Sequence, residues 1–372
     1  MNKSWEYKKI GDVCTVERGG SPRPIDKFIT DDENGINWIK IGDTTDSMYI
    51  THTAQKIIPE GMKKSRYVKP GDFLLSNSMS FGRPYILQID GCIHDGWLVL
   101  RDDDELFDKR FLYYYLSSKT TYEKFKSMAV GGVVNNLNSE MVRKVEVPIP
   151  DKGEQSDVAN LMDRLSKVID NRKKELEYFD DLIKARFVEM FGSIKSNDKG
   201  WDTVQLKDIA DVRGRVGWKG YKKEDLRESG PLVLGATHLT DSGELDLSAP
   251  VYLSREKYEE SPEIVLQKND LIFTQRGNTI GKVGLVAEDI GEATINPCVL
   301  ILRPLNIHPI YFKTYFVMDE TKDDMWMLNS GSAQPMITQK GIGEYQLMIP
   351  PIELQNQFAD FVKQVDKSKV VA

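Results

Sequence analysis

Cysteine, histidine and long apolar runs are scarce in this sequence. Its three cysteines, Cys14, Cys92 and Cys298, are isolated and form no CxxC, so their spacing indicates neither a disulfide framework nor a zinc site, and we interpret all three as packing residues. The four histidines show no metal-ligand or triad spacing. No apolar run approaches the ~18 residues that span a bilayer, and the N-terminus lacks a secretory signal. We therefore expect a cytoplasmic protein with no membrane association.

The signatures of DNA-modifying enzymes are also lacking. An adenine methyltransferase carries a [DN]-P-P-[FYW] tetrapeptide, but the single Pro-Pro pair, at positions 350 and 351, lies between isoleucines. No ExK follows Pro150-Asp151, as it would in a metal-dependent nuclease. The segment Gly277–Val283 has too few residues between its glycines for a phosphate loop, and no Ser or Thr follows Lys282. We expect no catalytic site, cofactor or metal ion in this chain.

An excess of basic charge is missing as well. With 57 acidic against 50 basic residues the net charge is -7, which tells against a protein that coats DNA non-specifically, because phosphate binding needs a positive field. Local basic patches can still serve a DNA reader.

What the sequence does contain is an internal repeat. Similar motifs return in the same order about 200 residues later, which indicates two homologous halves with small insertions in loops. The matched positions are Trp5 with Trp201, Asp72 with Asp270, Arg101 with Arg303, Phe111 with Tyr311, and Val147–Pro150 with Leu347–Pro350.

Each half consists of short β-rich runs followed by a helical region, which predicts an α+β fold. A long helix is expected over residues 154–191, with Gly192 as its terminator, and a shorter copy begins after Pro351. We predict that the two helices pack as an antiparallel coiled coil; a helix packed only on its own domain is the alternative. The expected divisions are 1–152 (first domain), 153–195 (first helix), 196–352 (second domain) and 353–372 (second helix).

The apolar face of the long helix is expected to bind partner subunits. Its members are Val158, Leu161, Leu165, Val168, Leu176, Phe179, Ile183 and Phe187.

These doubled motifs resemble the specificity subunit of type I restriction-modification systems. The resemblance covers the whole chain and rests on the W-x-x-x-x-[IL]-x-D openings at Trp5 and Trp201, the G-D and N-D strand starts at Asp72 and Asp270, and the I-P closings before EQSDVANL and LQNQFADF. The ending RFVEMFG of the first helix is similarly typical.

The resemblance implies two target-recognition domains that each read one part of a split DNA sequence, with the helices setting the unread gap. It implies double-stranded DNA as a partner, together with two methyltransferase subunits that methylate adenine at N6 with S-adenosylmethionine. It further implies a restriction/translocase subunit that uses ATP and Mg²⁺. The second helical region is about half as long as in the family, which departs from its pattern.

Base edges and phosphates are read by polar and basic side chains on glycine-bearing loops. Two such loops occur at matched places in each half, and a third, weaker pair follows later in each. The candidates in the first half are Arg18, Ser21, Arg23, Lys27, Ser76, Asn77, Ser78, Ser80, Arg83, Asn135 and Asn136. Those in the second half are Arg213, Arg215, Trp218, Lys219, Tyr221, Gln275, Arg276, Asn278, Thr279, Lys282, Ser332 and Gln334.

Two other classes of function stay open on the sequence alone. One is a structural coiled-coil protein with two sugar- or protein-binding domains, which would bind no DNA in a gel shift. The other is an intrinsic enzyme, which would transfer methyl groups to DNA without a partner.

Overall fold

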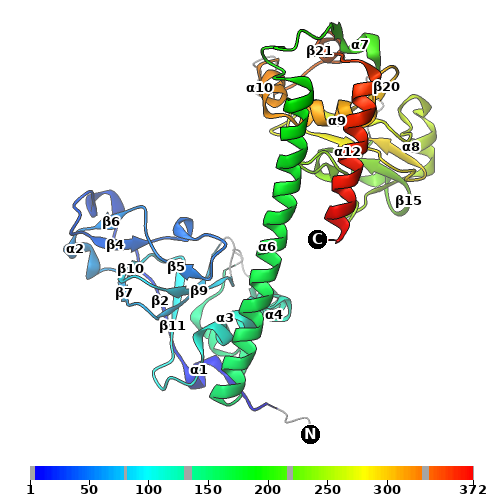
Figure 1. Cartoon of the computed structure of the whole chain (residues 1–372). Helices are drawn as coiled ribbons and strands as arrows, with labels where there is room; N and C mark the ends of the chain where they lie inside the picture. The colour runs from blue at the N-terminus through cyan, green and yellow to red at the C-terminus, as the bar shows by residue number, and fades with distance from the viewer. Residues whose placement is uncertain (1–4, 79–81, 130–135, 216–220, 329–334, 372) are drawn as a thin grey trace. The chain divides into compact units, whose positions relative to one another are not determined.

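The structure, a computed structural model, describes residues 5–78, 82–129, 136–215, 221–328 and 335–371. The chain folds into two compact units, Met1–Asp170 and Asn171–Ala372 (Figure 1). The division between them falls inside one continuous helix, α6 (Lys152–Phe191). None of the described helices is long and apolar enough to cross a membrane.

Unit 1 (Met1–Asp170) contains two larger sheets and one small one. The first has the order β2 (Thr15–Arg18), β11 (Trp97–Arg101), β8 (Phe73–Ser76), β9 (Pro84–Leu87) and β5 (Tyr49–Ile50). The second has the order β3 (Ile29–Thr30), β6 (Lys56–Ile57), β4 (Ile36–Ile39), β10 (Gly91–Ile93) and β7 (Arg66–Val68). The small sheet pairs β1 (Tyr7–Lys9) with β12 (Glu146–Pro148), antiparallel.

Strand β11 shows why the first sheet is apolar on both faces. Successive side chains of a strand point to opposite faces. Leu98 and Leu100 enter a core shared with the helices, whereas Trp97 and Val99 enter a second core on the other face. The helices of unit 1 before α6 are α1 (Ile10–Val13), α2 (Pro59–Met62), α3 (Lys109–Ser117), α4 (Lys119–Ala129) and α5 (Ser139–Arg143), with 3₁₀ turns η1 (Ile25–Lys27) and η2 (Ile41–Asp43).

Unit 2 (Asn171–Ala372) repeats this plan with shorter sheets. The first sheet has the order β14 (Ala210–Arg213), β20 (Val299–Pro304), β17 (Leu271–Thr274) and β18 (Val283–Leu285). The second has the order β16 (Tyr252–Leu253), β15 (Leu226–Leu234) and β19 (Ala293–Ile295). The small sheet pairs β13 (Thr203–Gln205) with β21 (Gln346–Met348). Its further helices are α7 (Leu206–Ile209), α8 (Arg255–Glu259), α9 (Pro309–Val317), α10 (Asp319–Met327), α11 (Gln339–Gly343) and α12 (Ile352–Val371), with 3₁₀ turns η3 (Lys223–Asp225), η4 (Ala236–His238) and η5 (Pro262–Ile264).

Matched ion pairs confirm the internal repeat. In unit 1 the Arg101 guanidinium lies 3.3 Å from the Asp72 carboxylate, and in unit 2 Arg303 donates to Asp270 at 2.7 Å. Both aspartates also accept a backbone N–H three residues upstream, at 3.0 and 2.8 Å. The repeated aspartates and arginines therefore hold the start of β8 and β17 to the end of the neighbouring strand, which explains why both residue types recur in the same order in the two units.

A buried glutamine performs a second repeated task at the start of the long helices. Gln155 donates from Nε2 to the carbonyl oxygen of Pro150 at 2.9 Å and accepts the N–H of Asp108 at 2.7 Å. Gln355 donates to Pro350 O at 2.8 Å and accepts the N–H of His308 at 2.8 Å. Each glutamine thus fixes its helix to the segment that precedes α3 or α9.

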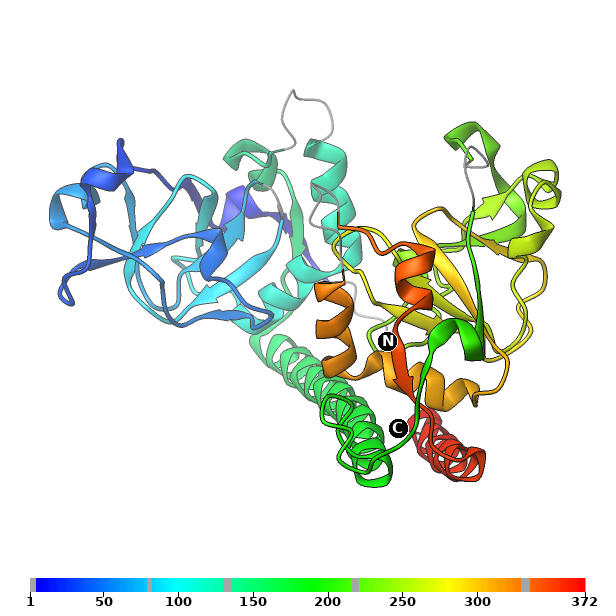
Figure 2. The ribbon, with the colours of Figure 1, turned by 90° about the horizontal axis from the view of Figure 1, so that it is seen from above.

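The two long helices are antiparallel where they meet. The ring of Phe358, near the start of α12, packs on Phe187 and Phe191 at the end of α6, with ring centroids 5.6 and 5.5 Å apart. Farther along α12, Lys369 pairs at 2.7 Å with Asp180, which lies earlier in α6 than Phe187. The two helices therefore run in opposite directions (Figure 1; Figure 2). The predicted antiparallel packing is confirmed. Helix α6 ends at Phe191, and Gly192 directly after it has a φ of +80°, as expected of the terminating glycine that the sequence indicated.

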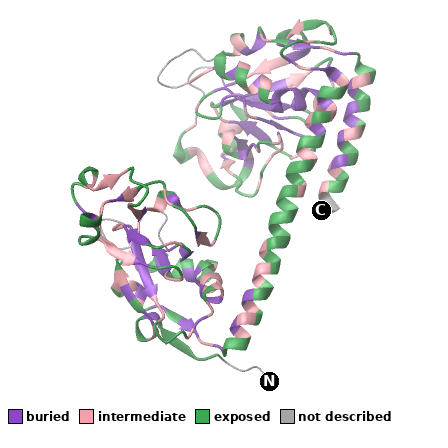
Figure 3. Ribbon diagram, turned by 60° about the vertical axis from the view of Figure 1, so that its left-hand side comes forward, coloured by how far each residue is buried: buried purple, intermediate pink, exposed green. Residues whose placement is uncertain are grey.

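The apolar face of α6 is not a single surface, which corrects part of the sequence prediction. Ile183 and Phe187 are buried in the core of unit 2, and Phe179 packs against that core, so these three are not free to bind a partner. Val158 is half-buried against the core of unit 1. Four members stay exposed in the middle of the helix, where Figure 3 shows little burial: Leu161, Leu165, Val168 and Leu176.

One cysteine also departs from expectation. Cys14 and Cys92 are buried, as a packing role requires, and burial raises the pKa of Cys14 to about 12. Cys298 is exposed in the turn before β20, so the prediction that it packs inside the protein was wrong.

Candidate nucleic-acid interface

The first candidate loop of unit 1 is held by Asp95, a residue in the turn between β10 and β11. Ser21 donates to its carboxylate at 2.7 Å, Arg23 lies 3.5 Å from the other carboxylate oxygen, and Arg18 donates to its carbonyl oxygen at 3.1 Å. The hydrogen bond from Ser21 lowers the pKa of Asp95. The loop approaches this turn so closely that a Cβ on Gly19 would lie 2.2 Å from the carbonyl oxygen of His94. Glycine is required there.

The second loop of unit 1 joins the same turn. Asn77 donates from Nδ2 to Asp95 O at 2.9 Å, and the N–H of Arg83 donates to the Ser76 hydroxyl at 2.9 Å, which closes the hairpin between β8 and β9. The two loops therefore meet beside the turn that precedes β11, at the end of the sheet where β2 and β8 finish.

Unit 2 anchors its loops in a corresponding way. Gln275 stands where unit 1 has Asn77, and its Nε2 donates to Pro297 O at 3.0 Å in the turn before β20. Arg215 donates to Ile295 O at 2.8 Å, and its guanidinium lies 5.8 Å from the ring centre of Tyr221. Burial lowers the pKa of Arg215. The two loops are therefore tied to neighbouring positions, the end of β19 and the turn that follows it.

The third, weaker pair of loops adjoins the second loop in both units. The N–H of Leu137 donates to Asn77 O at 2.9 Å, and the N–H of Ile337 donates to Gln275 O at 2.9 Å. Asn136, half-buried, lies directly before the first of these contacts. In unit 2 the exposed Arg276 donates from Nε to the Met336 sulfur at 3.1 Å.

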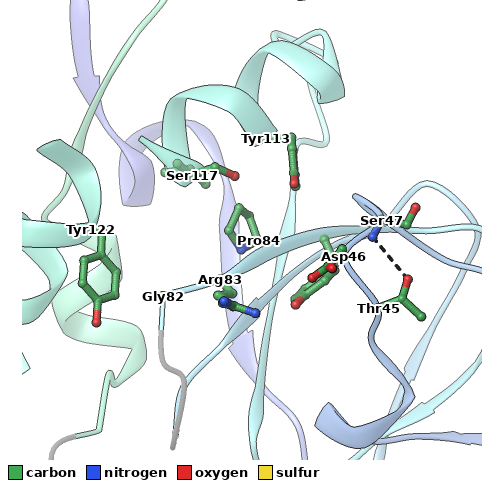
Figure 4. A pocket seen from close by; sticks show the side chains of 11 residues that line it. Thr45, Asp46, Ser47, Gly82, Arg83, Pro84, Tyr113, Ser117 and Tyr122 are labelled. Carbon is green, nitrogen blue, oxygen red and sulfur yellow. Dashed lines mark hydrogen bonds between the residues drawn. The ribbon is translucent and has the colours of Figure 1, made fainter. Parts of the chain in front are cut away.

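A cavity of about 490 Å³ lies beside the second loop of unit 1 (Figure 4). Arg83 lines it together with Asp46, with Tyr113 and Ser117 of α3, and with Tyr122 of α4. Within the described part of the chain Arg83 forms no ion pair. The equivalent cavity of unit 2, about 190 Å³, contains Lys282, which is paired with Asp241 at 2.8 Å. The Arg83 guanidinium is thus available to a ligand in unit 1, whereas the Lys282 ammonium group in unit 2 is paired with Asp241.

Four predicted DNA contacts are corrected by burial. Ser76, Asn77, Arg215 and Gln275 are at most 8% exposed, and the bonds above direct their polar atoms to the protein backbone. These side chains position the loops and do not reach a ligand at the surface. Arg213 is also restrained, because Asp211 lies 2.5 Å from its guanidinium.

The remaining candidates divide by exposure. The exposed candidates are Arg18, Arg23, Lys27, Arg83, Arg276, Asn278 and Thr279. The half-buried candidates are Ser21, Ser78, Asn136, Arg213, Tyr221 and Lys282. Outside the described residues lie Ser80, Asn135, Trp218, Lys219, Ser332 and Gln334.

The anchoring turns were missed in the sequence. Asp95 and Asn296 occupy the short turns that precede the repeated strands WLVLR and CVLILR, and Asn296 accepts the N–H of Cys298 at 2.8 Å. Their only sequence signal is a polar turn residue at a matched distance before a repeated strand. Over the part of the chain that the structure describes, no group of three or more His, Cys, Asp or Glu side chains could hold a metal ion.

Comparison with known proteins agrees with the repeated fold. Residues 2–178 and 198–370 each match the family described as "Type I restriction modification DNA specificity domain". The chain is 22% identical to the type I restriction enzyme MjaVIII specificity subunit of Methanocaldococcus jannaschii, over 98% of this chain and 86% of that protein. It is 21% identical to the EcoBI specificity subunit of Escherichia coli, over 98% and 80%.

A solved structure from work on the complex assembly and conformational transition of the type I R-M system shares the fold. It has a TM-score of 0.54 and 18% identity, with 99% of this chain and 91% of that chain covered. The chain belongs to the type I restriction-modification DNA specificity family. It is a DNA-recognition subunit and not a catalytic one, so the alternatives of a sugar- or protein-binding protein and of an intrinsic enzyme are set aside.

Proposed function

We propose that the chain binds double-stranded DNA through both units and that each unit reads one part of a bipartite sequence. The observation that carries this proposal is the repetition of the same loop scaffold: in each unit, polar side chains tie two separate loops to the segment that directly precedes β11 or β20. Exposed cations stand on these loops, Arg23 and Arg83 in unit 1 and Arg276 in unit 2. Arginine suits the task because its planar fork binds guanine edges or phosphates.

Bound to its site, the chain directs N6-adenine methylation and restriction by partner subunits. Two methyltransferase subunits would use S-adenosylmethionine, and a restriction/translocase subunit would use ATP and Mg²⁺; this chain itself would bind none of these. The exposed apolar side chains in the middle of α6 support a subunit contact, because Leu161, Leu165 and Val168 are 57%, 48% and 54% exposed on one helix. Such contiguous apolar surface is typical of interaction sites.

The decisive experiment maps methylated adenines in cells that express the chain with its methyltransferase partner. We expect a motif of two fixed half-sites separated by a gap of constant length and unrestricted sequence. A contiguous motif would contradict two independent readers. Methylation that persists after deletion of the gene would contradict the directing role.

Purified protein provides the complementary measurement. Incubated alone with DNA and labelled S-adenosylmethionine, the chain is expected to transfer no methyl group, whereas adding the methyltransferase subunit should produce transfer that depends on the DNA sequence. Sequence-independent methylation by the mixture would count against specificity residing in this chain.

A further inference from the structure

A short sequence motif recurs in both units outside the loop anchors. Thr-Asp-Ser occupies residues 45–47 after the 3₁₀ turn η2 and residues 240–242 at the same distance after η4. A glycine followed by a basic residue is repeated in the second loop, at 82–83 and 281–282, and both glycines have a positive φ. In each unit these two segments line one cavity. The two cavities are therefore equivalent parts of the repeat.

The charged pair in the cavity of unit 2 is closed. Asp241 lies 2.8 Å from Lys282, and the hydrogen bond from this lysine lowers the pKa of the aspartate. Lys313 of α9 lines the adjoining hollow, is 7% exposed and pairs with Glu244. Both lysines are therefore neutralised by carboxylates of their own unit, which leaves neither charge for a ligand.

The corresponding pair in unit 1 is open. Among the described residues, the Arg83 guanidinium and the Asp46 carboxylate form no ion pair and no side-chain hydrogen bond. Burial raises the pKa of the Tyr113 hydroxyl, while Arg83 lowers it and Asp46 raises it further, which indicates that both charges lie near this hydroxyl. The arginine and the aspartate thus face one cavity of about 490 Å³ without neutralising each other (Figure 4).

Tyrosine rings line the cavity of unit 1 where unit 2 has lysine side chains. At the offset of 200 between α3 and α9, Tyr113 corresponds to Lys313, and Tyr122 of α4 corresponds to Lys322 of α10. Tyr113 is half-buried and Tyr122 is 40% exposed, and both line the cavity (Figure 4). Aromatic side chains of this kind are the platforms on which proteins stack unpaired nucleobases. The cavity of unit 1 therefore combines a flat apolar surface with one free cation and one free carboxylate.

We propose that the cavity of unit 1 binds an unstacked guanine base. Arg83 donates to the acceptor atoms O6 and N7 of the base, Asp46 accepts its N1–H and N2–H groups, and a tyrosine ring stacks on its face. Adenine has no N1–H to donate to Asp46, and a phosphate group would be repelled by this carboxylate. The volume of the cavity lies within the ~300–1,000 Å³ that is usual for small-ligand sites.

Two sources can supply such a base. One is DNA from which a guanine is extruded, as happens where proteins take a base out of the helical stack. The other is a free guanine nucleotide. For the first source the inference rests on the proposed DNA recognition, whereas for the second source it is independent of it.

The first test titrates the purified full chain with guanosine 5′-monophosphate (GMP) in a calorimeter. We expect one GMP per chain with a Kd below about 1 mM, and binding of the adenosine and cytidine monophosphates that is at least about tenfold weaker. Asp46→Asn should weaken GMP binding at least about tenfold, because the acceptor of two N–H groups is lost. The matched control is Asp241→Asn, which changes the same motif in unit 2 and should bind GMP as the parent does.

The second test distinguishes the source of the base. It compares two DNA duplexes of identical sequence, one with an extra unpaired guanine and one with an extra unpaired adenine at the same place. At least about tenfold tighter binding of the guanine duplex, lost in Asp46→Asn and kept in Asp241→Asn, would identify an extruded base as the ligand. Preference for GMP with equal binding of the two duplexes would identify a free nucleotide.

The proposal is overturned if the chain prefers neither GMP over the other nucleotides nor the unpaired guanine over the unpaired adenine. It is also overturned if Asp46→Asn and Asp241→Asn have the same effect. Both aspartates are exposed, so neither substitution is expected to unfold the protein. Binding of fully paired DNA that carries the methylated motif is measured on the same samples. Failure of the parent protein to bind it would count against the proposed function, whereas such binding without a guanine preference would refute the cavity proposal alone.

Discussion

Among single side chains, Arg276 offers the sharpest test of sequence reading in unit 2. It is exposed at the point where the second and third loops meet, and its Nε contacts the Met336 sulfur. If its guanidinium holds a guanine edge, Arg276→Ala should cost about 1 to 3 kcal/mol of binding free energy and relax one half of the DNA site only. Binding to DNA libraries randomised in either half-site measures both effects.

Two arginines serve as controls for this substitution. Arg23→Ala should relax the other half-site, because Arg23 stands on a loop of unit 1. Arg255→Ala should leave specificity unchanged, since Arg255 lies outside the loops and pairs with Glu292 at 2.6 Å. A uniform loss across all DNA sequences would make Arg276 a phosphate contact instead.

Asp95 predicts a pH-dependent contribution to stability. Its pKa in the folded protein is lowered below the ordinary 3.8, chiefly by the hydrogen bond from Ser21. The stabilisation is therefore present above the unfolded pKa and is lost as pH falls through the folded pKa. Asp95→Asn should lower the melting temperature at about pH 6 and have little effect near about pH 2. The side chain is 43% exposed, so we expect a change below about 1 kcal/mol.

The roles of particular residues were only partly predictable from the sequence. The matched positions of Asp72 and Asp270 in the two halves indicated a repeat, but not that each aspartate binds an arginine on a neighbouring strand. Asn77 and Gln275 carry the side-chain types of base readers, yet both turn inward to satisfy backbone carbonyl groups. A polar side chain on a loop can face the solvent or its own turn, and only the three-dimensional course of the loop decides between them.

At the scale of secondary-structure elements, the buried glutamines predict how firmly the long helices are fixed. Gln155→Met keeps a similar volume but leaves the N–H of Asp108 and the carbonyl oxygen of Pro150 without their partner. We expect a loss of about 1 to 3 kcal/mol in the free energy of unfolding, and a similar loss for Gln355→Met. Chemical denaturation measures both.

The control for these substitutions lies on α12 itself. Gln357 is exposed, so Gln357→Met should change the free energy of unfolding by less than about 0.5 kcal/mol. If all three variants were equally stable, the buried hydrogen bonds would not be what seats the helices.

The same apolar period explains why the helix was predictable and its surroundings were not. Prolines before residue 152 and a glycine at 192 mark the ends of α6, and the three-four spacing of apolar residues marks its face. That spacing is identical whether the face fills its own domain, pairs with α12 or awaits another chain. Ile183 and Phe187 proved to be core residues, whereas Leu161 and Leu165 did not.

For the molecule as a whole, the proposed bipartite recognition makes the length of α6 a variable that can be altered. Seven residues inserted after Lys174 keep the apolar period nearly in phase and add ~10.5 Å of helix. DNA rises ~3.4 Å per base pair, so the unread gap should grow by up to about three base pairs while the half-sites stay the same. Mapping of methylated adenines in cells with the longer chain measures the gap.

A loop insertion of equal size controls for the added chain length. Seven residues placed after Asp289, in an exposed connection of unit 2, lengthen no helix and should leave the gap unchanged. A gap that stays constant with the insertion after Lys174 at full methylation activity would show that α6 does not set the spacing. Altered half-sites would show that the units are not independent readers.

The middle of α6 is stabilised by fewer packing contacts than its two ends. Its ends are anchored by Ala159 in one core and Phe187 in another, whereas Leu161, Val168 and Leu176 between them have large exposed fractions. Most helical stability in proteins comes from such anchoring, so this stretch depends on intrinsic propensity and on local pairs such as Arg172 with Glu175. Its backbone amides should exchange with deuterium faster than those at either end, and binding of the proposed partner subunit should slow the exchange. The free subunit would then carry a locally melting hinge that assembly converts into a stiff rod.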